Sequence, residues 1–145
     1  MGTHDELFVQ EYKPGYPEWD RDNEFHTKFL WMDETTLHGA PYLEVLWYYK
    51  PYDLGPNEHY HEHDEFLGFV GSDPSDPTNL NATVRVTLEG VDYRINKSTL
   101  VYIPAGMKHS IFAIEEMTKP ILHFSGGPNQ VSEKLGNTLG FKNVN

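Results

Sequence analysis

The alternation of apolar and polar side chains predicts a chain built mostly of short strands. Residues 82–88 alternate with period two, Glu89 and Gly90 form a candidate hairpin turn, and residues 91–95 lead back. Period-two alternation is typical of a strand that buries one face. Further strands are predicted over residues 7–12, 25–32, 42–50, 66–70, 99–103, 110–114 and 120–125.

For two of these strands, the sequence also predicts which side chains lie on each face. Residues 42–50 are apolar and aromatic on both sides, which favours a strand enclosed between two layers. In residues 25–32, the alternation places four side chains on one face: Phe25, Thr27, Phe29 and Trp31.

The connecting segments favour a barrel over a helical fold. The chain has 12 Gly and 10 Pro, and 14% of its residues are aromatic, a combination typical of short strands closed into a sandwich or barrel. Residues 72–81 read as an exposed loop, residues 19–24 as a polar connection, and only residues 131–139 have helical character. We therefore predict an all-β jelly-roll barrel of about ten strands with little helix.

The length of 145 residues fits a single domain. Within it, residues 1–41 supply N-terminal strands and connections, residues 42–125 form the barrel, and residues 126–145 form a C-terminal tail that includes the short helical segment.

Charge and hydropathy limit the classes of partner that the protein can bind. The formal net charge is −11 and the basic residues are scattered, so the field repels phosphate backbones and anionic lipid. No stretch approaches about 20 apolar residues, and residues 1–10 lack the pattern of a secretory leader. We expect a cytoplasmic protein that binds neither nucleic acid nor membrane and acts on a small molecule.

The main candidate chemistry lies in residues 59–65. If this segment is extended, His59, His61, His63 and Glu65 project to the same side. The chain has no cysteine, so any metal must be held by nitrogen and oxygen atoms. One strand can thus offer several imidazoles and a carboxylate to one point.

A second histidine-bearing element follows a sharp turn further along the chain. Pro104 fixes the first corner of this turn and Gly106 allows a tight exit, so the chain is re-aimed just before His109. Two strand-borne elements, separated by one long hairpin, can therefore converge on one metal ion.

These two elements resemble the paired motifs of the cupin superfamily. The first cupin motif contains His-x-His followed after three or four residues by Glu, and the second contains Pro-x-Gly-x-x-His. His59, His61 and Glu65 match the first, and residues 104–109 match the second. The resemblance covers residues 42–125 and implies a metal-binding β-barrel in which His59, His61, Glu65 and His109 bind one divalent ion.

The match departs from the family pattern at three positions. Asp53 stands where the first motif has its leading glycine, and the closing glycine, Gly71, comes one residue early. Ala113 stands where the second motif ends in Asn.

A shifted register remains an alternative for the first motif. It begins at Gly55 and uses His61 and His63, but no glutamate follows at position 67 or 68. We prefer the register with Glu65, because this residue leads into the apolar run and its carboxylate balances the charge of a divalent ion. His63 is kept as an alternate ligand.

Such a ligand set suits iron, manganese, nickel, cobalt or zinc and leaves one or two coordination positions open. The resemblance implies a family of varied activities, so the fold does not decide the reaction. We expect a metal-dependent enzyme acting on a small oxygen-chelating metabolite, with a dioxygenase favoured over an isomerase or lyase. The alternative is a small-molecule binding or regulatory protein without turnover.

Acid–base candidates beyond the ligands are few. Glu44, Tyr102 and His123 are candidate catalytic residues, and His26 and His38 rank below them. Residues 7–12 precede the barrel and can pair with an edge strand, their own or a neighbour's, so we expect a homodimer, as the cupin resemblance also implies.

Overall fold

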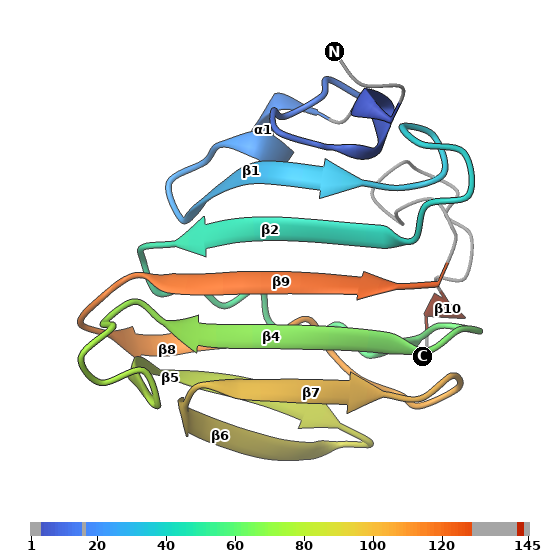
Figure 1. Cartoon of the computed structure of the whole chain (residues 1–145). Coiled ribbons are helices and arrows are strands. Elements are labelled where there is room, and N and C mark those ends of the chain that lie inside the picture. Colours follow the sequence, from blue (N-terminus) through green and yellow to red (C-terminus); the bar gives the residue numbers. More distant parts are fainter. Residues whose placement is uncertain (1–3, 16, 129–141, 144–145) are drawn as a thin grey trace.

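The computed structural model describes residues 4–15, 17–128 and 142–143, and most of the regular secondary structure within them is β-strand (Figure 1). Two short helices precede the strands: a 3-10 helix, η1 (Asp5–Leu7), and α1 (Glu18–Arg21). The ten strands are β1 (His26–Met32), β2 (Tyr42–Tyr48), β3 (His59–Tyr60), β4 (Glu65–Gly71), β5 (Asn79–Leu88), β6 (Val91–Lys97), β7 (Thr99–Ile103), β8 (Ala113–Met117), β9 (Ile121–Gly127) and β10 (Lys142–Asn143).

The longer strands form two antiparallel sheets. A five-stranded sheet has the order β1-β2-β9-β4-β7, and a three-stranded sheet has the order β6-β5-β8. The two-residue strands β3 and β10 pair with each other. Figure 1 shows β5, β6 and β8 lying against the β4 and β7 side of the larger sheet. The predicted all-β architecture is confirmed.

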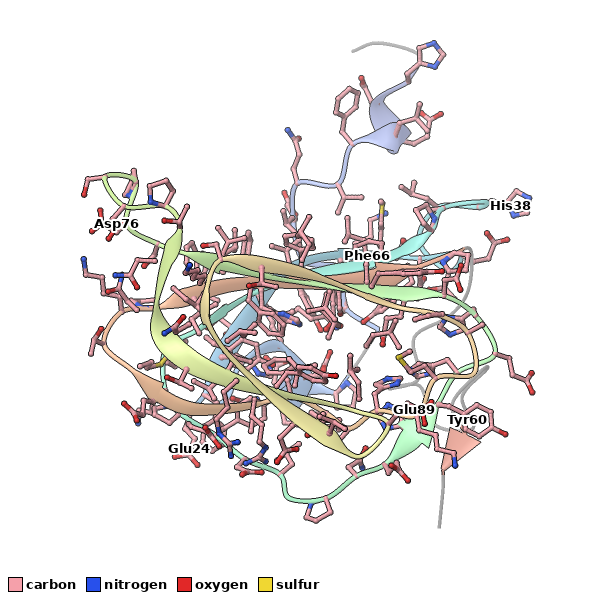
Figure 2. All side chains as sticks on the ribbon, turned by 90° about the horizontal axis from the view of Figure 1, so that it is seen from below. Glu24, His38, Tyr60, Phe66, Asp76 and Glu89 are labelled. Atoms are coloured by element: carbon pink, nitrogen blue, oxygen red, sulfur yellow. The ribbon has the colours of Figure 1, made fainter. Side chains whose placement is uncertain are left out.

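The core fills the space between the two sheets (Figure 2). On β5, Leu80, Val84 and Val86 are buried at alternate positions and face Leu46 and Phe69 of the larger sheet. Each such side chain stabilises the fold by roughly 1.5–3 kcal/mol when it is fully buried. Alternation on β5 therefore places its apolar face inward, as predicted.

The predicted hairpin turn at Glu89 and Gly90 is confirmed. Both residues have positive φ, 49° and 78°, and they connect β5 to β6. Positive φ at both central residues gives a two-residue turn the twist that its flanking strands need.

Several predicted element boundaries are wrong. Residues 7–12 do not form a strand: η1 ends at Leu7, Leu7 and Phe8 are exposed, and none of the strands in the described part of the chain pairs with this segment. The strand expected at residues 110–114 begins later, as β8. The polar connection at residues 19–24 includes most of α1.

The loop expected over residues 72–81 is also shorter than predicted. β5 begins at Asn79, and Leu80 is completely buried in the core. A single apolar residue among polar ones carried too little pattern to mark the start of a strand.

The face predicted for residues 25–32 is wrong as well. The pairing of β1 with β2 shifts between Lys28 and Leu30, and this irregularity breaks the period-two alternation. His26 and Lys28 are buried instead of Thr27 and Phe29, which are partly exposed, while Trp31 is buried as expected. A bulge inserts one residue and thereby exchanges the faces of the residues around it.

The helical character of residues 131–139 lies outside the described residues. Within the ranges that the structure describes, no helix is both long and apolar enough to cross a lipid bilayer.

Candidate metal centre

Three histidines from two distant segments meet inside the barrel. One ring nitrogen from each of His59, His61 and His109 can be chosen so that all three lie within 4.8 Å of one another. The ring centroids of His59 and His109 are 4.3 Å apart, and that of His61 is 5.1 Å from each. All three side chains are buried. The structure thus brings together the three histidines singled out in the sequence.

Backbone hydrogen bonds hold the two segments together. The N–H of His59 donates to the carbonyl of His109 at 2.8 Å, and the N–H of His109 donates back to His59 at 2.8 Å. The N–H of Gly106 donates to the carbonyl of His61, also at 2.8 Å. Gly106 has a φ of +84°, a conformation that glycine adopts readily and other residues rarely do. The Pro-x-Gly turn therefore fixes His109 beside His59.

The same backbone orients two of the imidazole rings. Nδ1 of His59 lies 2.8 Å from the carbonyl oxygen of Asn57, and Nδ1 of His109 lies 3.0 Å from that of Met107. A carbonyl only accepts, so each Nδ1 carries the proton and donates. The Nε2 atoms are left with lone pairs, which is the arrangement that metal-binding histidines use.

Burial also keeps the His59 ring neutral. The pKa of His59 falls from 6.5 to about 4, mainly because the side chain is buried; His109 and His61 also lower it, while Asn57 and Glu65 act in the opposite direction. A neutral imidazole is the form that binds a metal ion, so His59 is ready to bind at neutral pH.

Glu65 adds a carboxylate to the group. Its Oε1 lies 3.3 Å from Nε2 of His109 and 3.7 Å from Nε2 of His61. Glu65 is the first residue of β4, in the larger sheet, whereas His59 lies on β3. The side chain therefore reaches the histidines from the opposite layer.

Residues 59–65 are not one continuous strand, contrary to the prediction. β3 ends at Tyr60, the chain bends at Glu62 and His63, and β4 begins at Glu65. The bend is needed because the chain passes from the sheet region of β3 to the larger sheet. Simple alternation therefore does not describe these side chains.

His63, the alternate ligand, lies at this bend outside the group of three. Its ring stacks on His61 with centroids 4.9 Å apart, and its Nδ1 lies 3.0 Å from the carbonyl of Asp64. It is only half-buried. The geometry brings His59 rather than His63 to His61 and His109.

The donor set fits the divalent metal that the resemblance implies. Three neutral nitrogens and one carboxylate oxygen suit a first-row transition metal, and the carboxylate offsets part of its charge. His59, His61, Glu65 and His109 would hold the ion. We call these four residues the histidine–glutamate group.

The group opens onto a cavity of about 770 Å³. His59, Glu65 and His109 line it together with aromatic and apolar side chains from both layers. The other lining residues are Trp19, Asp20, Asn23, Glu24, Phe25, His26, Glu44, Tyr48, Tyr52, Leu54, Leu67, Ser110, Ile111, Phe112, His123 and Ser125.

The catalytic candidates are distributed unevenly around this cavity. Glu44 and His123 line it, and Nδ1 of His123 lies 2.9 Å from the carbonyl of Gly68. Tyr102 lies on the edge strand β7, is 63% exposed and does not line the cavity. His26 lines it, whereas the His38 side chain is 97% exposed and paired with Glu34.

Sequence reasoning missed several polar residues in and behind the cavity wall. Ser125 lines the wall beside Glu44, and Lys28 is completely buried behind it. Neither belongs to a motif. The only available signal was their place on strands, and the bulge in β1 obscured it for Lys28.

Comparisons with known proteins give matches among solved structures alone. No family model matches the chain, and no curated protein matches its sequence. The polyketide cyclase RemF from Streptomyces resistomycificus is 14% identical, with a TM-score of 0.53, over 100% of this chain and 86% of that one. A Streptomyces PAC13 variant with uridine is 7% identical, with a TM-score of 0.50, over 92% of each chain.

A third match names the fold in its description. It is an uncharacterized Klebsiella pneumoniae protein with a double-stranded β-helix domain, 14% identical, with a TM-score of 0.50, over 86% of this chain and 88% of that one. At such low identity these matches establish the fold and not the activity. The chain has a double-stranded β-helix fold, which is the fold that its resemblance to the cupins implies.

Proposed function

We propose that the protein is a metal-dependent enzyme that acts on a small metabolite bound through oxygen atoms. The observation that carries this proposal is the histidine–glutamate group, three buried imidazoles and a carboxylate in the wall of a cavity of about 770 Å³. A purely structural histidine cluster would not need to face a cavity of this size.

The chain's own residues prepare the site for an ion. His59 and His109 hold their Nδ1 protons on backbone carbonyls, so that Nε2 of each is available as a ligand. Glu65 supplies the negative oxygen within 3.7 Å of both of its histidine neighbours. These contacts orient the ligand atoms toward one another, so we expect an ion to bind with little rearrangement.

The other residues that line the cavity suit a small ligand. Tyr48, Tyr52, Leu67 and Phe112 line the same cavity as the histidine–glutamate group and make part of its wall apolar. A divalent ion bound there would polarise an oxygen-bearing ligand and, if it is iron, support oxidation by dioxygen. The aromatic lining suits an aromatic metabolite, and for this reason we favour a dioxygenase over an isomerase or lyase.

The ligand assignment is tested by metal analysis of purified variants. His61→Ala and His109→Ala should each lose bound metal in elemental analysis, while circular dichroism keeps the β signature. His38→Ala is the matched control, because its side chain is 97% exposed and should leave the metal content unchanged. Stoichiometric metal in both site variants would show that the assignment is wrong.

The reaction type is tested separately. Protein loaded with iron(II) is incubated with catechols, keto acids and sugars, once in air and once under nitrogen. Oxygen uptake supports a dioxygenase, and anaerobic turnover supports an isomerase or lyase. Tight binding without turnover in any of these incubations would favour the alternative, a binding protein.

A further inference from the structure

A buried ion cluster lies in and behind the wall of the same cavity, and the metal ligands do not include any part of it. Nζ of Lys28 lies 2.6 Å from Oδ2 of Asp20 and 3.3 Å from Oε1 of Glu44. The side chains of Lys28 and Asp20 are fully buried, and that of Glu44 is 7% exposed. Two carboxylates and one ammonium give the cluster a formal net charge of −1.

Hydroxyl groups fix Glu44 within this cluster. The Ser125 hydroxyl donates to Oε2 of Glu44 at 3.2 Å, and the Tyr42 hydroxyl donates to Oε1. Ser125 is also the residue that faces Glu44 in the pairing of β9 with β2. Glu44 is therefore a positioned carboxylate, held from three sides, and it lines the cavity.

The sheet register places Glu44 at a useful distance from the metal ligands. Glu44 pairs with Ser125, and Ser125 pairs with Leu67, so these residues form a row across β2, β9 and β4. Glu65 lies two residues before Leu67 on β4. The Cα atoms of Glu44 and Glu65 are therefore two strand spacings apart across the sheet and two residues apart along a strand, which gives a separation of about 12 Å. A substituted aromatic ring is long enough to contact both side chains across this distance.

The charges around the cavity restrict what can bind at the Glu44 end. Four carboxylates line the cavity: Asp20, Glu24, Glu44 and Glu65. Within the described part of the chain, no lysine or arginine is among the lining residues, and the Lys28 ammonium already contacts two carboxylates. Phosphate and carboxylate groups would meet like charge here and find no cationic side chain to pair with.

We propose that Glu44, with Ser125 beside it, binds a hydroxyl or ammonium group of the ligand, so that the protein selects neutral or cationic metabolites and rejects phosphorylated and dicarboxylic ones. The metal-bound end of such a ligand rests on the proposed function, whereas the preference at Glu44 does not. Glu44 accepts hydrogen bonds from the ligand, and its negative charge strengthens them.

Four catechol probes test this preference. Each has the same pair of oxygens to chelate a metal, and they differ at the end of a short arm: dopamine carries an ammonium, hydroxytyrosol a hydroxyl, 4-ethylcatechol a methyl, and 3,4-dihydroxyphenylacetate a carboxylate. Their affinities are measured by isothermal titration calorimetry on protein loaded with zinc, which has no redox chemistry.

We expect dopamine and hydroxytyrosol to bind about tenfold more tightly than 3,4-dihydroxyphenylacetate, because a hydrogen bond to a charged group has roughly that effect on affinity. In Glu44→Gln, the affinities for dopamine and the carboxylate probe should converge to within about threefold, since the amide is neutral. Glu116→Gln, which removes an exposed carboxylate on β8, is the control and should keep the wild-type order.

Equal affinity for all four probes, or tighter binding of the carboxylate probe, would overturn the inference. If Glu44→Gln does not fold, Ser125→Ala replaces it: loss of the hydroxyl that holds Glu44 should weaken dopamine binding severalfold, and unchanged binding counts against the inference.

Metal content separates this inference from the proposed function. If wild-type protein binds no zinc, the proposed function fails, and the same four probes are then titrated into the metal-free protein. The expected order of affinities there supports the role of Glu44 by itself. If zinc binds but the order is absent, the proposed function stands and the inference fails.

Discussion

Lys28 shows how a single charged residue can be tolerated inside the barrel. Its ammonium contacts the carboxylates of Asp20 and Glu44, and it lies 5.7 Å from the ring centroid of Trp31. A buried charge without partners costs several kcal/mol, so these contacts are needed for the fold to accept it. The same contacts fix the carboxylate of Glu44 at the cavity wall.

We therefore expect Lys28→Met to destabilise the protein strongly. The substitution keeps the apolar stem but leaves two buried carboxylates without their cation, which should lower the free energy of unfolding by roughly 3–5 kcal/mol. Urea unfolding followed by circular dichroism measures the change.

Lys119→Met is the matched control for this variant. Nζ of Lys119 lies 2.9 Å from Oδ2 of Asp73, but both side chains are partly exposed, at 47% and 25%. An exposed pair contributes little to stability, because water screens its charges. Equal losses in the two variants would contradict the role assigned to the buried cluster.

Single residues were predictable from the sequence where they belong to a spaced motif. His59, His61 and His109 were singled out because their spacing relates two segments, and the structure brings them together. Lys28 and Ser125 were not, because each acts through partners that the fold alone brings close. The carboxylate of Glu44 is 16 residues from Lys28 in the chain and 81 from Ser125.

Among the elements, the turn before His109 has the largest effect on the site. It links the two motifs through the hydrogen bond from Gly106 to His61, and His109 then pairs with His59. Gly106 sustains a φ of +84°. A side chain at this position would strain the turn that aims His109.

Gly106→Ala should therefore weaken both stability and metal binding. The left-handed conformation costs an L-residue roughly 1–2 kcal/mol, and displacement of His109 should reduce zinc affinity by about tenfold. Competition with a chromogenic chelator measures the affinity.

Gly39→Ala is the control for the strain alone. Gly39 has a φ of +86°, with open space around it, and lies in the loop between β1 and β2. It should lose similar stability but keep its zinc affinity. A similar loss of affinity in both variants would mean that the turn at Gly106 has no specific role.

For the secondary-structure elements, the sequence predicted the presence of strands better than the residues at which they begin and end. Alternation identified β5 and the β5–β6 turn, because each strand there buries one face only. It failed at β1, where the bulge exchanges faces, and at residues 7–12, which pair with none of the strands that the structure describes. Pairing partners and bulges depend on distant parts of the chain, which a local pattern does not contain.

On the scale of the whole molecule, the outer face of the larger sheet carries exposed apolar side chains. Leu100 and Tyr102 on β7 are 75% and 63% exposed, and Phe66, the pairing partner of Tyr102 on β4, is 41% exposed. Phe66 lies on this outer face in Figure 2. Within the described residues, β7 is also an edge strand, with backbone groups that can pair with another chain.

We therefore expect a homodimer that forms through β7 rather than through residues 7–12. Light scattering should give twice the chain mass of 16.7 kDa at micromolar concentration.

Leu100→Lys should shift the protein toward monomer, because a charge at the centre of an apolar contact must be desolvated without a partner. Leu7→Lys, at an exposed site in η1, is the control and should leave the dimer intact. A monomeric wild-type protein would contradict the dimer, and a monomer produced by Leu7→Lys alone would move the interface to the N-terminal segment.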